Sequence, residues 1–138
     1  MRSLNDQKLY RIIDANFNRA KEGLRVCEDI CRFILNDPLL TKNFKSLRHR
    51  LTHIILLLEL EDLIGARDIE RDVGKKSSRS ESTRKKWLDI FYANIQRVKE
   101  SIRVLEEFSK LTNVKLSQNI KNIRYKLYAL EKKTSAKF

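Results

Sequence analysis

Apolar residues recur every three or four positions along most of this chain, which is the spacing of amphipathic α-helices rather than of strands. Three breaks interrupt the pattern: Asn36-Asp37-Pro38, a charged stretch after Gly65, and Thr112-Asn113. Gly and Pro end or begin helices at such places. The pattern predicts helices from the N-terminal residues to about Leu35, from Pro38 to about Ile64, from just after Ser82-Thr83 to about Leu111, and from about Lys115 to Lys133.

The segment 15–28 reappears at 93–106. Eight of the fourteen aligned positions are identical, in chain order Ala, Asn, Arg, Lys, Glu, Arg, Val and Glu, where unrelated helices would share about one. The similarity continues between residues 47–51 and 123–127. We therefore predict an all-α fold, in which two internally repeated helical hairpins form an antiparallel four-helix bundle with pseudo-twofold symmetry.

The length suits a single helical domain over residues 1–138. Its parts are repeat 1 over about 6–64, a charged connecting loop over about 65–86, and repeat 2 over about 87–133. The loop carries both charges up to Gly74, and then six basic residues against one acidic residue as far as Lys86. A connection this long is either functional or a mobile linker, and both interpretations stay open.

The formal net charge of +12 favours anionic partners such as nucleic acid, an acidic membrane or a phosphorylated small molecule. The N-terminus does not resemble a signal peptide, and the longest apolar run, Ile54–Leu58, is too short to span a membrane. We expect a cytoplasmic protein with no membrane association and with two reduced cysteines. Because the segment Ile54–Leu60 is apolar on nearly all sides, we also predict a homodimer or a higher oligomer.

Polar residues interrupt the apolar face of the predicted first and third helices at matching places. A helical wheel puts an Asn and an Arg within each face and a Glu at its margin, namely Asn16, Arg19 and Glu22 in repeat 1, and Asn94, Arg97 and Glu100 in repeat 2. A buried guanidinium group needs partners. Either Arg–Glu ion pairs are locked in the core, or the two rows meet in a cavity that binds an anion. Arg suits phosphate because its planar fork donates two parallel hydrogen bonds.

Further charged residues fall on the opposite side of the same wheel, including Arg25 and Glu28 in the first copy and the repeated Arg103 in the second. A solvent-exposed face would explain the two repeated arginines, and an interface between subunits would explain them equally well.

Asp68 and Asp72 are the best candidates for a magnesium site, because Mg²⁺ is usually held by one or two carboxylates together with phosphate oxygens. Arg67 and Lys75 lie beside them and could bind a phosphate chain. A connector held by salt bridges would explain the same residues. The chain contains no P-loop and no Gly-rich dinucleotide motif.

Two other groups of residues invite a function that the pattern does not favour. Cys27, Cys31, His49 and His53 have the spacing of zinc ligands, but the wheel points both histidines away from the core, so we expect buried thiols instead. Nucleic-acid binding through the basic residues 75–86 is disfavoured, because it leaves the repeated Asn and Arg without a role.

Five segments together resemble a small all-helical family of thiamin biosynthesis: Ile12–Glu28, Leu47–His49, Ala66–Gly74, Ala93–Glu107 and Arg124–Glu131. The family occurs alone or fused ahead of a thiamin phosphate synthase barrel. The resemblance implies a phosphotransferase that uses Mg²⁺ and ATP to convert 4-amino-5-hydroxymethyl-2-methylpyrimidine phosphate into the diphosphate. A non-catalytic module that binds a phosphorylated ligand or partners thiamin phosphate synthase is the alternative.

Within that reaction we expect a division of labour among the residues singled out above. Phosphoryl transfer depends mainly on positioning and on positive charge. The expected roles are stabilisation of the transferring group by Arg19 and Arg97, orientation of the pyrimidine or its phosphate by Asn16 and Asn94, Mg²⁺ binding by Asp68 and Asp72, orientation of the arginines by Glu22 and Glu100, and further phosphate contacts from Arg48, His49 and Arg67.

Overall fold

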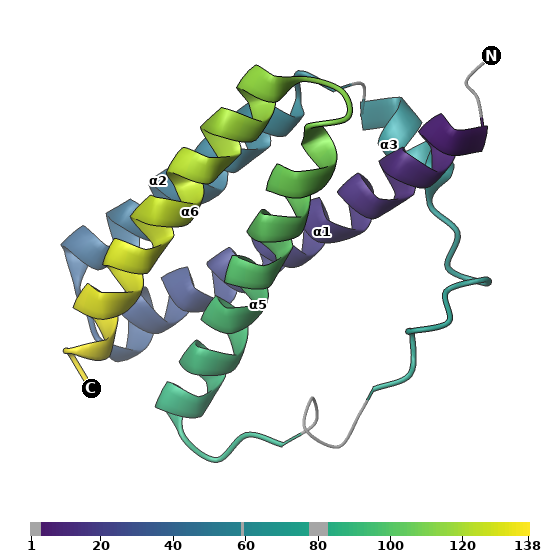
Figure 1. The fold of residues 1–138 in the computed structure, drawn as a ribbon. Helices are drawn as coiled ribbons and strands as arrows, with labels where there is room; N and C mark the ends of the chain where they lie inside the picture. Colours follow the sequence, from purple (N-terminus) through teal and green to yellow (C-terminus); the bar gives the residue numbers. More distant parts are fainter. Residues whose placement is uncertain (1–3, 59, 78–82) are drawn as a thin grey trace.

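The computed structural model describes residues 4–58, 60–77 and 83–138, and this part of the chain is all-helical, as predicted. Its helices are α1 (Leu4–Asp29), which continues as the π-helix η1 (Ile30–Ile34), then α2 (Pro38–Ile55), α3 (Leu60–Ala66), α5 (Trp87–Ser109) and α6 (Val114–Ser135). α1 and α2 form one hairpin and α5 and α6 the other, with α1 packed against α5 (Figure 1). None of these helices is both long and apolar enough to cross a membrane.

The helix starts follow the capping side chains. Asp37 accepts a hydrogen bond from the main-chain N–H of Leu40 at 2.9 Å, with Pro38 in the first turn of α2, as predicted. Asn113 does the same for the N–H of Leu116 at 3.2 Å. The carboxylate of Asp89 instead sets the start of α5 at Trp87, later than the predicted start after Ser82-Thr83; Ser82 lies outside the described residues.

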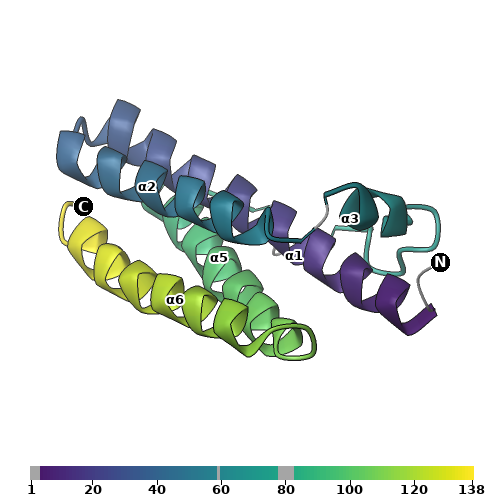
Figure 2. The ribbon, with the colours of Figure 1, turned by 90° about the horizontal axis from the view of Figure 1, so that it is seen from above.

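The predicted second helix is in fact two helices, and the prediction that Gly65 ends it is wrong. α2 ends at Ile55, where the N–H groups of Leu57 and Leu58 bond to carbonyl groups only three residues back, at 3.2 and 2.9 Å. This tighter turn stops the α-helix. The chain then re-forms as α3, which contains Gly65 and lies beside the N-terminal half of α1 (Figure 2), where Leu63 is fully buried.

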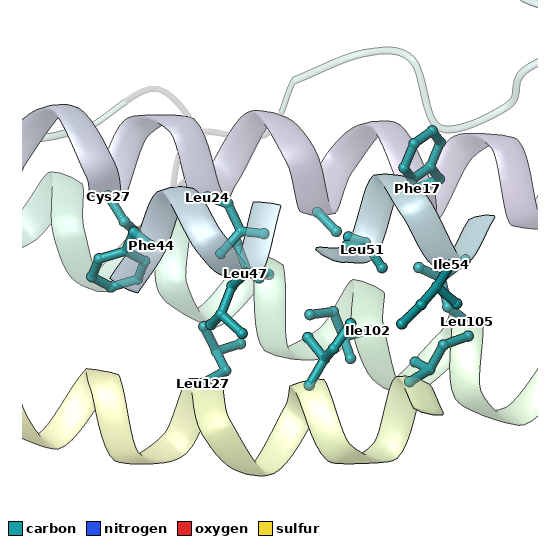
Figure 3. Packing of buried hydrophobic residues seen from close by; sticks show 14 of the residues in the cluster. Phe17, Leu24, Cys27, Phe44, Leu47, Leu51, Ile54, Ile102, Leu105 and Leu127 are labelled. Carbon is teal, nitrogen blue, oxygen red and sulfur yellow. The ribbon is translucent and has the colours of Figure 1, made fainter. Parts of the chain in front are cut away.

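One hydrophobic core joins the four long helices of the described chain. Figure 3 shows how their side chains meet: Phe17 and Leu24 from α1, Phe44 and Leu51 from α2, Ile102 and Leu105 from α5, and Leu127 from α6. The wheel prediction for α1 is partly wrong, because Arg19 is exposed and Glu28 is buried. The reason is that α1 packs against α2, α3 and α5 at once, so its buried face is centred on Phe17 and Leu24 and extends to both sides.

α1 and α5 approach each other closely at Gly23. A Cβ atom at this position would lie 2.5 Å from Cγ2 of Val98 and 3.1 Å from the main-chain oxygen of Asn94. It would overlap Val98 and crowd the carbonyl of Asn94, so the two helices can lie at this distance only with a glycine here. The aligned position in repeat 2 is Ser101, whose hydroxyl instead donates to the carbonyl of Arg97 at 2.7 Å.

Each hairpin contains an equivalent buried ion pair. Nη2 of Arg48 on α2 lies 3.1 Å from Oε1 of Glu28 on α1, and Nε of Arg124 on α6 lies 2.7 Å from Oε2 of Glu106 on α5. Both glutamate side chains are almost fully buried. The hydrogen bond to Glu106 raises the pKa of Arg124 above its usual range. Each pair therefore ties the two helices of one repeat together.

The repeated Arg25 and Arg103 are exposed and lie one turn from these glutamates. Nη1 of Arg25 is 3.2 Å from Oε2 of Glu28, and Nη1 of Arg103 is 3.8 Å from Oε2 of Glu106. Their exposure agrees with a solvent-exposed face, and each arginine adds a charge contact to the buried ion pair of its hairpin; the subunit interface stays a prediction.

The apolar run that begins at Ile54 is only partly buried. Ile54 and Ile55 belong to the core, whereas the side chains of Leu56 and Leu57 are 55% and 70% exposed. An exposed apolar surface is what a subunit interface would cover. The homodimer itself stays a prediction.

We expect the substitution Gly23→Ala to lower the free energy of unfolding by about 1–3 kcal/mol, because the added methyl group overlaps Val98 and the backbone of α5. The matched control is Gly65→Ala, since a Cβ atom in α3 meets nothing within 4 Å and Ala favours a helix by up to about 1 kcal/mol over Gly. Urea unfolding of both variants measures the difference. Equal stability of the two variants would contradict the close approach.

Neutralising the buried carboxylate by Glu106→Gln should lower the free energy of unfolding by about 3 kcal/mol, because Arg124 then keeps an uncompensated charge in a mostly buried site. The adjacent Glu107 is exposed and pairs with Lys110 at the surface, so Glu107→Gln should leave the unfolding midpoint nearly unchanged. Thermal and chemical denaturation followed by circular dichroism would test both. A loss in Glu107→Gln as large as that in Glu106→Gln would argue against the buried pair.

Candidate functional site

A cleft opens between α1, the segment that follows α3, and α5. It consists of two adjoining cavities of about 550 and 880 Å³. Seven residues line both of them and mark where they meet: Asp14, Ala15, Asn16, Arg19, Arg67, Ile69 and Asp72. We call the smaller cavity the N-terminal lobe and the larger one the α5 lobe.

The two lobes differ in their other walls. The remaining residues of the N-terminal lobe are Lys8, Arg11 and Ile12 from the start of α1 and Asp68 from the loop. The α5 lobe is completed mainly by polar residues, Asn18, Glu22, Gly74, Lys75, Ser77, Arg97, Glu100 and Ser101, together with Val104. The cleft therefore has a smaller, partly apolar end and a larger, mostly polar end.

A bidentate ion pair holds the loop of the cleft against α1. Nε and Nη2 of Arg67 each lie 2.8 Å from an oxygen of the Asp14 carboxylate, which is buried. Asn18 donates a further hydrogen bond to this carboxylate at 3.1 Å. The pair raises the pKa of the Arg67 guanidinium above its usual range. Arg67 thus stays charged and in place at the junction of the two lobes.

Asp14 is not among the predicted site residues. The repeat gives no sign of its role, because the position of repeat 2 that aligns with Asp14 is Tyr92. The sequence feature that could have pointed to Asp14 is its position directly before the repeated segment. The charged loop that follows repeat 1, and that has no equivalent after repeat 2, offers the partner for its carboxylate.

The loop beyond Arg67 is organised by its own aspartates. The carboxylate of Asp68 accepts a hydrogen bond from the N–H of Arg71 at 3.1 Å, and its main-chain oxygen accepts one from Nη2 of Arg11 at 3.1 Å. Oδ1 of Asp72 accepts the N–H of Gly74 at 2.9 Å. These bonds hold the 67–74 segment in a defined turn along α1.

Several cations of the cleft are not neutralised by the protein. Nη1 of Arg19 makes one long hydrogen bond, 3.5 Å, to Oδ1 of Asn16. Within the described chain, the side chains of Lys75 and Arg97 have no hydrogen-bond or ion-pair partner. Unpaired cations on three separate segments suit an anionic ligand such as a phosphate chain.

The structure brings most of the predicted site residues together and leaves three apart. In the cleft lie Asn16, Arg19, Glu22, Arg67, Asp68, Asp72, Arg97 and Glu100. Asn94 is not among the lining residues, and its amide donates to the carbonyl of Ile90 at 2.8 Å. Arg48 is held by Glu28, and His49 is exposed on α2, so neither lies in the cleft.

The carboxylates expected to bind Mg²⁺ are not equivalent. Asp72 lines both lobes and uses one oxygen for the N–H of Gly74, whereas Asp68 lines one lobe and its carboxylate is occupied by Arg71. Across the described ranges, no three His, Cys, Asp or Glu side chains gather as a protein metal site. The residues present fit an ion held by Asp72 together with ligand phosphates, which is the common mode for Mg²⁺.

Both cysteines are buried in the core, as expected, and free of disulfides. Burial raises the pKa of the Cys31 thiol to about 11 and that of Cys27 further still. At neutral pH the two thiols are therefore protonated and unreactive. His53, like His49, is exposed, so the four residues do not form a zinc site.

Comparison with known proteins identifies the family. The profile of the ThiD2 family matches residues 11–133 of the chain. The chain belongs to the ThiD2 family. This match includes most of α1, the segment that follows α3, and α5, which together form most of the cleft.

Several relatives of the chain are named thiamine-phosphate synthase, which confirms the expected association with thiamin biosynthesis at the level of the family. The protein of Thermosynechococcus vestitus is 41% identical over 126 residues, which cover 91% of this chain and 35% of the relative. The protein of Nostoc sp. is 42% identical over 126 residues, which again cover 91% of this chain and 35% of the relative. The protein of Synechocystis sp. is 39% identical over 95% of this chain and 37% of the relative. The chain thus spans about a third of these relatives. No solved structure matches it.

We expect Asp14→Asn to loosen the 67–77 loop, because the amide keeps the size of the side chain but loses the charge that holds Arg67. Amide hydrogen exchange in the loop should become about tenfold faster, which corresponds to about 1.4 kcal/mol of local stability. Asp29→Asn is the control, since its carboxylate is half exposed and pairs only with Arg25 at the surface. Unchanged exchange in Asp14→Asn would show that the loop does not depend on this pair.

Proposed function

We propose that the protein is a phosphotransferase of thiamin biosynthesis. It transfers the γ-phosphoryl group of ATP to 4-amino-5-hydroxymethyl-2-methylpyrimidine phosphate and so forms the pyrimidine diphosphate. The observation that carries the proposal is the convergence of Arg19, Arg67 and Arg97, from α1, the loop and α5, on one cleft beside Asp72. Such a site offers positioning and positive charge, which are the main requirements of phosphoryl transfer.

The chemistry needs no strong general base. An oxygen of the pyrimidine phosphate attacks the γ-phosphorus of ATP, the bond from that phosphorus to the β,γ-bridging oxygen breaks, and ADP leaves with the electron pair. The attacking oxygen is already ionised at neutral pH. Arg19 and Arg67 would hold the two reacting phosphates at the junction of the lobes, while Asn16 orients the acceptor.

Mg²⁺, when bound, would neutralise charge on the transferring phosphates. Asp72 is the side chain best placed to hold it, with Asp68 contributing through water. Glu22 and Glu100 lie at the polar edge of the cleft, and Gln96 donates to Glu100 at 3.1 Å. These two carboxylates would limit the orientations open to the arginines.

The similarity to thiamine-phosphate synthases indicates which kind of enzyme would use the product of the proposed reaction. A diphosphate is a better leaving group than a monophosphate, so a kinase of this kind would supply an activated pyrimidine to a coupling enzyme. The relatives that carry this name are roughly two and a half times as long as this chain, since 126 residues are 35% of each of the first two. We propose that the ThiD2 segment contributes the kinase step and that a thiamin phosphate synthase is its functional partner.

A second candidate function is a non-catalytic module that binds a phosphorylated pyrimidine for such a partner. The observation in its favour is that Asp72 is the one carboxylate of the proposed pair that is not already occupied by an arginine. Product formation separates the two functions.

The proposal predicts stoichiometric ADP and pyrimidine diphosphate when the purified protein is mixed with Mg·ATP and the pyrimidine phosphate. Arg19→Ala and Arg97→Ala should each lower kcat/KM by more than about tenfold, because each removes a charge from the reacting phosphates. Arg103→Ala is the matched control, an exposed arginine on α5 outside the cleft, and should keep nearly full activity.

All three variants should retain their helical circular dichroism, because the three arginines are exposed. Losses below tenfold in both Arg19→Ala and Arg97→Ala would exclude their central role. Saturable binding of the pyrimidine phosphate without turnover would leave the binding module in place of the kinase.

A further inference from the structure

The two lobes of the cleft are unequal in a way that matches two unequal ligands. The N-terminal lobe measures about 550 Å³, and of the residues that it does not share with the other lobe Ile12 is apolar, whereas Lys8, Arg11 and Asp68 are charged. The α5 lobe measures about 880 Å³ and adds mainly polar and charged walls, in which Lys75 and Arg97 lie together with Glu22 and Glu100. A single symmetric site between two repeats would not have this asymmetry.

We propose that the two lobes are separate subsites, an inference that rests on the proposed function. The N-terminal lobe takes the flat, methylated ring of the pyrimidine phosphate, and the α5 lobe takes the nucleoside triphosphate. Ring surfaces gain from burial against Ile12, Ala15 and Ile69. The larger and more highly charged nucleotide needs the larger volume, and it meets the unpaired cations Lys75 and Arg97.

In this arrangement the phosphate of the pyrimidine ligand and the γ-phosphate of the nucleotide face each other. Arg19, Arg67 and Asp72 line both lobes, so they stand where the acceptor phosphate and the γ-phosphate would meet. Asp14 fixes Arg67 at that junction through two hydrogen bonds of 2.8 Å. Both ligands would therefore bind at the same time, with their reacting ends in contact with the same guanidinium groups.

Substitutions of Lys75 and Ile12 allow the two subsites to be tested separately. Each lines one lobe only, and neither side chain is buried in the core, since Lys75 is exposed and Ile12 is partly exposed. Lys75→Ala should weaken binding of a non-hydrolysable ATP analogue with Mg²⁺ by about tenfold, and Ile12→Ala should weaken binding of the pyrimidine phosphate by about tenfold. Each variant should bind the other ligand within about twofold of the wild type.

Isothermal titration calorimetry measures these affinities without turnover. In the wild type, saturation with the ATP analogue should leave the pyrimidine phosphate able to bind with one-to-one stoichiometry. Mutual exclusion of the two ligands would overturn the inference, as would an effect of Lys75→Ala mainly on the pyrimidine phosphate or of Ile12→Ala mainly on the nucleotide. Absence of nucleotide binding to the wild type would overturn it too.

The outcome for the subsites is distinct from the outcome for the kinase. Independent binding of both ligands without product in the activity assay would end the kinase proposal and keep the two subsites. Product formation with crossed effects of the two variants would keep the kinase and end the assignment of the lobes.

Discussion

The close contact between α1 and α5 at Gly23 is the constraint on which the rest of the structure depends. Only a residue without a Cβ atom lets α1 lie against Val98 and the carbonyl of Asn94. This contact joins the two hairpins into one core, and it sets Arg19 and Arg97 on the same cleft. Stability and the proposed chemistry therefore share one physical cause, the distance between the two repeated helices.

Ionised side chains in this protein fall into two groups with different surroundings. Glu28 with Arg48, and Glu106 with Arg124, are buried pairs in which each guanidinium has a carboxylate partner from the neighbouring helix. Arg19, Lys75 and Arg97 line the cleft without a carboxylate partner in the described part of the chain. Paired charges hold helices together, whereas the three cations without a carboxylate partner can attract a phosphate ligand.

The site does not follow the repeat. The ion pair between Asp14 and Arg67 has no counterpart in repeat 2, where Tyr92 occupies the aligned position, and the loop that it anchors occurs once. As a result the cleft is built from α1 and the loop on one side and from α5 on the other. Asn16 therefore lines the cleft and the repeated Asn94 does not, although the amide of each donates to a carbonyl of its own helix, Asn16 to Ile12 at 2.9 Å and Asn94 to Ile90 at 2.8 Å. The two similar segments of sequence thus contribute unequally to a site with two unlike ends.

The sequence by itself determined the all-α class, the start of α2 at Asp37-Pro38, the buried thiols and eight of the residues that line the cleft, because helical periodicity, caps and repeated polar residues act over a few neighbouring positions. Only the tertiary structure decided that α2 stops at Ile55, that Glu28 is buried while Arg19 is exposed, and that Asp14 holds Arg67. The physical reason is that a helical wheel places residues around one axis, whereas burial depends on which neighbours lie on each side of the helix. Three helices, α2, α3 and α5, pack around α1. The positions of α3 and α5 depend on the turn before α3 and on the loop before α5, and neither of these segments shows a helical periodicity in the sequence.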